Sequence, residues 1–481
     1  MTATEGEQQR RQLAECFERA GLTLEQLWMR YFALGGDVGL MELDAYLNGV
    51  MALPRVQRDM AAHAVNERLD ELVGRNRAPY SRPMRQSRPS HGPLAALVDL
   101  LDGAHRAPPE RLPAIMDVAA EALDLRVGVY LADYAGRTLV PVGGAGRRAL
   151  EVENTPAGEA FQRGDVVIDG EQDGTRLWAV LLDGVERLGV LEVVPTDGTD
   201  PHDPLLRDQC RWLAYLFGHL VTVTTQYGDG LDRVRRPEHR GPVPELLWAA
   251  LPPLTGATES VVVAAATEPA YTLSSDVFDY ALSETSASFA VFDAGGHEPA
   301  ASLAAVVALS AYRAARRDGG DLRAQARAVD EAVGGLGNGA VSGVLGEFDV
   351  ATGRVSHLAA GHPPPLVMRE GKVTGPPGEG RAAPFGRGDD ERVVAEEDLR
   401  PGDVVVLYTD GAVGARDRHG VPFGRPGLVE VLEQEAPGRL LPEAARRVIE
   451  AVLAHREDDL ADDATILLLC PCGDERSSRW F

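Results

Sequence analysis

The stretch VFDAGGHE, residues 291–298, places a carboxylate at the end of a segment that is typical of a buried strand. The preceding residues, ASFAVF at 287–292, are almost all apolar, and Asp293 follows them directly. Gly295 and Gly296 come next, before a long alanine-rich helical segment. A charge in such a place is costly unless something pairs with it. The sequence therefore predicts that Asp293 has a partner of opposite charge.

Three other segments of the C-terminal half also place aspartate beside an apolar run. They are YTLSSDVFDYAL (271–282) with Asp276 and Asp279, DVVVLYTDGAV (403–413) with Asp410, and DDLADDATILLL (458–469) with Asp462 and Asp463. Each aspartate alone is typical of a turn, and Asp-Gly is a common hairpin signal. Four such sites in one sheet-forming region indicate carboxylates that converge, and these repel one another unless cations lie between them. Because Mg²⁺ and Mn²⁺ prefer oxygen ligands, and no His/Cys cluster suggests zinc, we expect one of these two ions.

The bulk properties of the chain argue against nucleic acid and membrane as partners. The 481 residues carry a formal net charge of −25, with 73 acidic against 48 basic side chains, whereas a nucleic-acid binder needs a basic face. The polar start has no apolar signal-peptide core, and no run approaches the roughly 18 apolar residues of a membrane-spanning helix. The four cysteines are too scattered for a disulfide framework. We therefore expect a cytoplasmic protein.

Changes in composition divide the chain into three folded segments joined by two linkers. The predicted boundaries are 1–75 for a helical module, 76–91 for a linker, 92–226 for an α+β domain, 227–243 for a second linker, 244–470 for the domain that carries the aspartates, and 471–481 for a tail. In the first segment, apolar residues at helical spacing predict helices over 22–34, 40–53 and 56–74. This pattern favours a small helical bundle or a dimerisation module.

The middle segment combines helices with short strands. Strands are predicted at 126–133, 137–144, 176–184 and 187–195, and a final helix at 205–226. The stretches TPAGEAFQRGDVV (155–167) and LWAVLLDGVERLGVLEV (177–193) resemble a GAF domain. This resemblance implies a sensor that binds a small ligand, although no Cys or His is suited to anchoring haem or bilin. A purely structural or dimerising role is the alternative.

The last folded segment contains an ordered series of motifs. They are SSDVFDYAL (274–282), FAVFDAGGHE (289–298), FDVATGRVSHLAAGHPPPLV (348–367), VVVLYTDGAVGARD (404–417) with VPFG (421–424), and DDATILLL (462–469). Together they resemble the SpoIIE-type PPM serine/threonine phosphatases, the metal-dependent phosphatases of bacterial stress and sporulation signalling. The resemblance implies a sandwich of two antiparallel sheets flanked by helices, with two metals at one end. The expected fold class is therefore α+β and multidomain, with a helical module, a GAF-like domain and a C-terminal αββα phosphatase sandwich.

The resemblance also implies roles for particular residues. Asp293 would bridge both metals, the carbonyl of Ala294 would bind the first, and Asp410 and Asp462 would complete the second. Asp276 would act mainly through a metal-bound water. Two divalent ions about 4 Å apart can lower the pKa of a water from about 15.7 towards about 7 and can neutralise a phosphoryl group. The partner predicted for Asp293 is therefore a pair of Mn²⁺ or Mg²⁺ ions.

Some residues of these motifs have supporting roles or depart from the family pattern. Asp279 is expected to support the metal site from outside the ligand set, and His297 and His362 are expected to be structural. The family has Gly-Gly where residues 274–275 are serines, and Glu298 replaces a glycine. Because the four main aspartates are present, an active enzyme is favoured. The alternatives are a pseudophosphatase that binds its partner without turnover, and a ligand sensor in which the GAF-like domain carries the main function.

The resemblance implies a substrate class as well. SpoIIE-type phosphatases usually act on phosphoserine or phosphothreonine of STAS-domain anti-anti-sigma proteins, and so release a sigma factor by partner switching. We therefore expect a phosphorylated STAS-domain protein as the partner, in stress response and sigma-factor regulation. The N-terminal modules suggest a homodimer whose input domains control the phosphatase.

Overall fold

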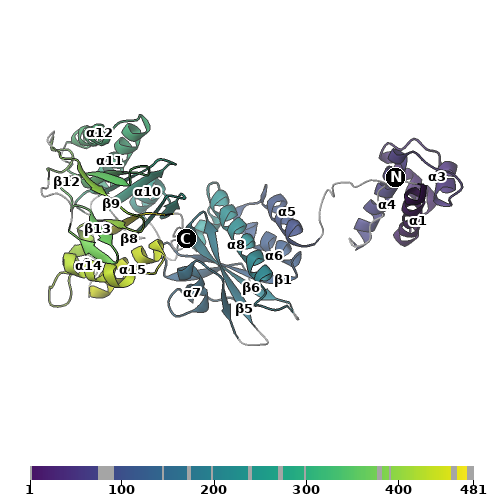
Figure 1. Cartoon of the computed structure of the whole chain (residues 1–481), viewed down its shortest axis with the longest axis horizontal. Coiled ribbons are helices and arrows are strands. Elements are labelled where there is room, and N and C mark those ends of the chain that lie inside the picture. Colours follow the sequence, from purple (N-terminus) through teal and green to yellow (C-terminus); the bar gives the residue numbers. More distant parts are fainter. Residues whose placement is uncertain are drawn as a thin grey trace. The chain divides into compact units, whose positions relative to one another are not determined.

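The chain forms two compact units, residues 1–99 and residues 100–481 (Figure 1). The computed structural model describes residues 3–73, 91–143, 146–170, 175–196, 199–236, 241–268, 275–296, 299–337, 339–375, 382–388, 392–456 and 463–473. The predicted linker at 76–91 lies almost entirely outside the described residues, as does most of the predicted tail. Within the described part of the chain, no helix has the length and apolar character needed to span a membrane.

The first unit is built from helices. They are α1 (Ala3–Ala20), α2 (Leu24–Ala33), α3 (Leu40–Leu47) and α4 (Arg55–Val73). The three predicted helices are confirmed, although α3 ends six residues early, before a turn at Gly49 with φ +75°. Helix α1 was not expected as a separate element, because its sequence is polar. Its buried apolar side chains, Leu13, Cys16 and Ala20, recur only every three or four residues and pack into the core of the unit.

The second unit begins with an antiparallel sheet and its covering helices. The helices are α5 (Pro93–Ala104, which starts in the first unit), η1 (Pro109–Arg111), α6 (Leu112–Glu121), α7 (Pro156–Arg163), α8 (Pro204–Thr225) and α9 (Gly230–Val234). The strands, in the order β3-β2-β1-β6-β5-β4, are β1 (Leu125–Ala132), β2 (Thr138–Val142), β3 (Leu150–Glu151), β4 (Val167–Asp169), β5 (Arg176–Asp183) and β6 (Glu186–Pro195). Gly218 lets α8 approach β5 closely, since a Cβ there would lie 2.2 Å from the carbonyl oxygen of Leu182. The predicted strands and the final helix are confirmed; membership of the GAF family stays a prediction.

Helix α9 lies inside the segment that was predicted to be a linker at 227–243. Leu231 is buried, and the guanidinium of Arg235 stacks 4.4 Å from the ring centre of Tyr134. The same guanidinium donates a hydrogen bond to the carbonyl of Ala132. These contacts hold residues 227–236 against the sheet. The charged composition of the segment is typical of a linker, and the sequence alone does not reveal the contacts.

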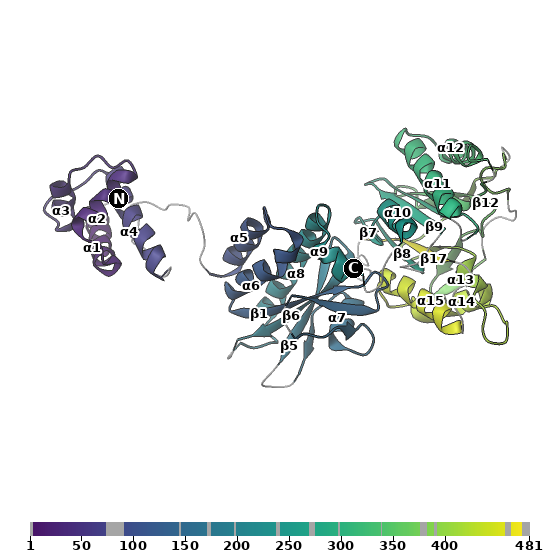
Figure 2. The same ribbon diagram turned by 180° about the vertical axis from the view of Figure 1, so that it is seen from behind.

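The rest of the second unit is a sandwich of two antiparallel sheets between helical layers (Figure 2). One sheet, in the order β15-β12-β11-β10-β9, contains β9 (Asp276–Leu282), β10 (Ser286–Asp293), β11 (Ser342–Asp349), β12 (Arg354–Ala360) and β15 (Ala395–Asp398). The other, in the order β14-β13-β16-β17-β8-β7, contains β7 (Thr255–Ala257), β8 (Val261–Glu268), β13 (Leu366–Arg369), β14 (Lys372–Thr374), β16 (Val404–Tyr408) and β17 (Ala464–Pro471). The helices are α10 (Pro242–Ala250), α11 (Pro299–Arg317), α12 (Leu322–Gly334), α13 (Gly411–Gly414), α14 (Gly424–Glu435) and α15 (Leu441–His455). The predicted αββα sandwich is confirmed.

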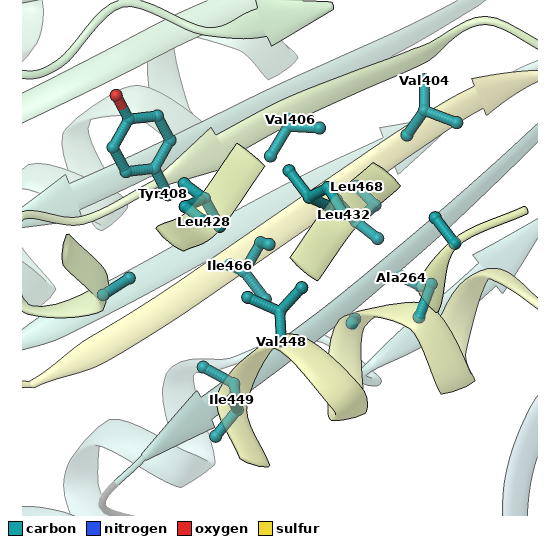
Figure 3. Packing of buried hydrophobic residues seen from close by; sticks show 14 of the residues in the cluster. Ala264, Val404, Val406, Tyr408, Leu428, Leu432, Val448, Ile449, Ile466 and Leu468 are labelled. Carbon is teal, nitrogen blue, oxygen red and sulfur yellow. The ribbon is translucent and has the colours of Figure 1, made fainter. Parts of the chain in front are cut away.

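Alternation along the strands separates three apolar layers. In β10, Phe289 and Val291 join the core between the two sheets, whereas Ala290 and Phe292 pack against α11 and α12. The outer layer of the other sheet packs on α14 and α15 (Figure 3). Its labelled side chains include Val404, Val406, Ile466 and Leu468 from the strands and Leu428, Leu432 and Val448 from the helices. The same alternation places Asp293 on the side of Val291, between the sheets.

Candidate metal centre

Asp276 and Asp293 lie directly opposite each other in the structure. Asp276 is the first residue of β9 and Asp293 the last of β10, and the two are paired in the antiparallel register. Residues opposite one another in such a ladder have Cβ atoms about 4.5–5.5 Å apart. Both side chains are buried, and both face the space between the sheets, on the side of Phe278 and Val291. Two of the predicted metal ligands therefore converge at one end of the sandwich.

The carboxylate of Asp276 is held by Thr409, which directly follows β16 of the other sheet. The Thr409 hydroxyl donates to Asp276 Oδ2 at 2.7 Å, and the Thr465 backbone N–H donates to the Thr409 Oγ1 at 2.9 Å. Burial, followed by the charges of Asp293 and Asp463, raises the pKa of Asp276 well above its usual 3.8, although hydrogen bonds from Thr409 and Thr465 act against this rise. A cation between the carboxylates would favour their charged forms, so this donor set fits a divalent metal.

Asp463 is the site residue that the sequence analysis undervalued. It is 3% exposed, and its Oδ2 accepts hydrogen bonds from the Ser275 N–H at 2.5 Å and from the Ser275 hydroxyl at 3.1 Å. Because Ala464 packs outwards against α15, Asp463 and Thr465 share the inner face of β17. This period of two in DDATILLL was the available signal. Ser275, a glycine in the family pattern, uses its hydroxyl to tie the start of β9 to the start of β17.

The remaining predicted ligands differ in their exposure and position. Asp410 is exposed and is the N-cap residue of α13, in the turn after β16. Its neighbour Thr409 is tied to β17, because the Thr409 N–H donates to the Thr465 carbonyl at 3.0 Å. Ala294 is buried, and its N–H donates to the Ser275 carbonyl at 3.3 Å. Asp462 lies outside the described residues. Within the described residues, no group of three or more His, Cys, Asp or Glu side chains is arranged to hold a metal ion.

Asp279 does not face the metal site. It is 2% exposed and pairs with Arg313 at 2.6 Å and Arg316 at 2.7 Å, both on α11. Side chains alternate along β9, so Asp279 lies on the helix side of the sheet and Asp276 on the inner side. The expectation that Asp279 supports the metal site is therefore corrected: it anchors α11 to β9. The sequence could not show this, because the two arginines lie more than thirty residues further along the chain.

The histidines and glycines of the motifs also have local explanations. His362 is fully buried, and its Nδ1 lies 3.0 Å from the Pro363 carbonyl, consistent with a structural role. Gly296 has φ +117°, a conformation that favours glycine. A Cβ on Gly295 would meet nothing within 4 Å, and both glycines line a cavity of about 660 Å³ beside Ala294. His297, Glu298 and Ser274 lie outside the described residues.

Comparison with known families adds an independent observation. Residues 283–471 match the model of the family described as Stage II sporulation protein E (SpoIIE). The C-terminal part of the chain is thus a SpoIIE-type PPM phosphatase domain. PPM phosphatases depend on Mg²⁺ or Mn²⁺. The match begins after β9, so the position of Asp276 rests on its register with Asp293 and on its bond to Thr409.

Similar solved structures come from several bacteria. The RsbU and RsbW domains of a Mycobacterium tuberculosis protein share 22% identity and a TM-score of 0.41, over 46% of this chain and 62% of that one. The phosphatase domain of Bacillus subtilis SpoIIE with a fragment of its regulatory domain shares 18% identity and a TM-score of 0.39, over 45% of this chain and 65% of that one. The SiaA-PP2C domain of Pseudomonas aeruginosa shares 21% identity and a TM-score of 0.39, over 44% and 85%. No curated protein sequence matches the chain.

Proposed function

We propose that the chain is a metal-dependent protein serine/threonine phosphatase. The observation that carries this proposal is the buried pair Asp276 and Asp293, paired in register on the inner face of one sheet. Buried carboxylates at such a distance need a cation, and the segment that contains Asp293 belongs to a family of metal-dependent phosphatases. None of the four cysteines lies among the residues of this site, so the reaction needs no thiol nucleophile.

The proposed site binds two metal ions. Asp276, Asp293, Asp410, Asp462 and the carbonyl of Ala294 are the proposed ligands of two Mn²⁺ or Mg²⁺ ions. Such ions, when bound, supply a water of lowered pKa and positive charge for the phosphoryl group.

Two contacts hold these ligands in position. The Thr409 hydroxyl fixes the orientation of the Asp276 carboxylate, and Thr409 itself is fixed by the Thr465 N–H. The bond from Ser275 to Asp463 keeps the ends of the two sheets together where the proposed ligands converge.

The proposed substrate is a regulatory phosphoprotein, a STAS-domain anti-anti-sigma factor carrying phosphoserine or phosphothreonine. The SpoIIE family match supports this substrate class. Control by the helical module and the GAF-like domain, a small ligand on the latter, and a homodimer are parts of the same proposal. A pseudophosphatase that binds its partner without turnover is the alternative.

Hydrolysis of p-nitrophenyl phosphate by the full-length protein tests the proposal. We expect turnover with Mn²⁺ or Mg²⁺, none with EDTA, and a loss of at least about a thousandfold in Asp293→Asn and Asp410→Asn. Asp398→Asn is the matched control, because Asp398 is exposed on the edge strand β15 and its side chain pairs with the exposed Arg354. A wild-type protein that neither turns over substrate nor binds Mn²⁺ in calorimetry would favour the alternative.

A further inference from the structure

A charged seam joins the middle segment of the chain to the phosphatase domain, within the second unit. Arg187 of β6 lies 3.4 Å from Glu443 of α15, and Glu153 pairs with Arg446 at 2.6 Å and Arg447 at 2.9 Å. Arg187 also stacks on Phe161 and donates to the carbonyl of that residue. We define the seam by the residues that pair across it: Arg137, Glu153, Arg187, Glu268, Glu443, Arg446 and Arg447.

One ion pair of the seam is formed at the end of β8. Arg137 of the middle segment pairs with Glu268 at 2.8 Å, and Glu268 is the last residue of β8. The Glu268 side chain is 12% exposed, and burial raises its pKa despite the charge of Arg137. The Glu268 carboxylate is therefore largely desolvated, although the Arg137 side chain is 42% exposed, and the pair ties the middle segment to β8.

The residue before Glu268 connects this contact to the candidate metal centre. Thr267 is the register partner of Thr465 in β17, and the two hydroxyl oxygens are 2.9 Å apart. Thr465 reaches Asp276 through Thr409: the Thr465 N–H donates to the Thr409 hydroxyl oxygen, and this hydroxyl donates to Asp276 Oδ2. Either hydroxyl can be the donor in the bond between Thr267 and Thr465, because each threonine hydroxyl can both donate and accept.

We propose that Thr267 is a positioning residue for the metal centre, and that the seam acts on Asp276 through Glu268 and Thr267. This inference rests on the proposed phosphatase function. The order of contacts is Arg137 to Glu268, then along the chain to Thr267, then to Thr465, and finally through the Thr409 hydroxyl to Asp276. Docking of the middle segment thus sets the orientation of a metal-binding carboxylate, which gives the sensor-like domain a direct means of control.

The seam has room for water but not for an organic effector at this point. Thr267 and Glu268 line a cavity of about 70 Å³ together with Tyr134, Arg137 and Arg446. Ligand-binding pockets are usually several times larger, about 300–1,000 Å³. In this proposal the contact between the two parts of the unit carries the signal to Thr267, and a ligand of the sensor-like domain would act by changing that contact.

Metal affinity measured on the full-length protein tests the proposal first. Thr267→Val keeps the shape of the side chain and removes the hydroxyl, and residues that orient metal ligands typically contribute about 10–100-fold to affinity. Because Thr267→Val loses the hydrogen bond to Thr465, we expect it to weaken Mn²⁺ binding in calorimetry about tenfold. Thr267→Ser keeps the hydroxyl and is expected to restore the affinity. Arg137→Gln is expected to weaken it in the same direction and by less. Thr374→Val, which removes a hydroxyl bonded to the Val367 carbonyl on the far edge of the same sheet, is the control.

Hydrogen exchange in the metal-free protein separates this inference from the proposed function. Thr267→Val and Arg137→Gln are expected to speed exchange at the Thr465 amide, which donates to Thr409, and Thr374→Val is expected to leave it unchanged. Unchanged exchange at Thr465 in both variants overturns the inference, whether or not the protein binds metal. Unchanged Mn²⁺ affinity in Thr267→Val, beside a wild type that binds Mn²⁺, also overturns it. A wild type that binds no metal removes the proposed function, and the exchange result then decides the coupling by itself.

Discussion

Two buried carboxylates of the second unit have opposite surroundings. Glu443, on α15, accepts hydrogen bonds from Arg446 at 2.6 and 2.9 Å and from Arg447 at 3.1 Å, and it faces Arg187. Asp276, at the start of β9, lies opposite Asp293 and accepts a hydrogen bond from the Thr409 hydroxyl. Around Glu443 the chain supplies cations of its own. Around Asp276 it supplies further carboxylates.

The pKa values of the two groups record this difference. Burial raises the pKa of Asp276, and the charges of Asp293 and Asp463 raise it further. Burial would also raise the pKa of Glu443, but the hydrogen bond from Arg446 and the charges of Arg187, Arg446 and Arg447 lower it overall. A buried acid surrounded by arginines is a structural contact, whereas buried acids that face one another indicate a site for a cation from solution.

The largest effect on stability is expected at Glu443. Glu443→Gln leaves arginines buried in the seam without their counter-charge, and breaking a buried pair typically costs about 3–5 kcal/mol. We expect a loss of about 3 kcal/mol in the free energy of unfolding, measured by urea denaturation. Glu396→Gln, in the exposed pair with Arg354, is the control and is expected to show no measurable change. If the two variants behaved alike, the seam would be solvated and the comparison would not hold.

Added metal should stabilise the folded protein through the carboxylates around Asp276 and not through the arginines around Glu443. A ligand at one hundred times its Kd stabilises the folded state by about 2.7 kcal/mol, so Mn²⁺ should raise the unfolding free energy of the wild type by about that amount. Glu443→Gln should keep most of this increment, since Glu443 is not a proposed metal ligand, and should lose only the part that depends on docking of the middle segment. Asp293→Asn should lose it. An increment that survives in Asp293→Asn would place the ion elsewhere in the chain.

A smaller effect of opposite sign is expected at Asp276. Without metal, Asp276→Asn removes a buried charge that faces two other carboxylates, and the amide oxygen can still accept the hydrogen bond from Thr409. The metal-free variant should therefore be more stable than the wild type by about 1 kcal/mol, although it loses phosphatase activity. Urea denaturation in EDTA measures this difference. A less stable variant would mean that the chain already balances the charge of Asp276.

The sequence predicted one of these clusters much better than the other. Asp276 and Asp293 were accessible because an aspartate beside an apolar run is a local feature of the chain, and the sandwich was accessible because the ordered motifs resemble a known family. The seam was not, because Arg187 and Glu443 are 256 residues apart and nothing local distinguishes Glu443 from an exposed residue of a helix. Asp279 was misjudged for the same reason, since its arginine partners come from another element. Patterns in sequence report which face a residue occupies, but not which distant charge it meets there.

The smallest effect, and the one that separates the clusters most directly, is the dependence of stability on pH. The folded-state pKa of Asp276 is raised, so its contribution to the stability of the metal-free protein is fully present below about pH 3.8 and is lost as the pH rises through the folded-state value. The folded-state pKa of Glu443 is lowered, so its contribution is present above about pH 4.5 and is lost as the pH falls through the folded-state value. In urea denaturation from about pH 3.5 to about pH 7, the gain from Asp276→Asn should therefore grow with pH. The loss from Glu443→Gln should grow with pH as well, so the two variants diverge from the wild type in opposite directions. Curves that stay parallel to the wild type would show that neither carboxylate changes its pKa on folding.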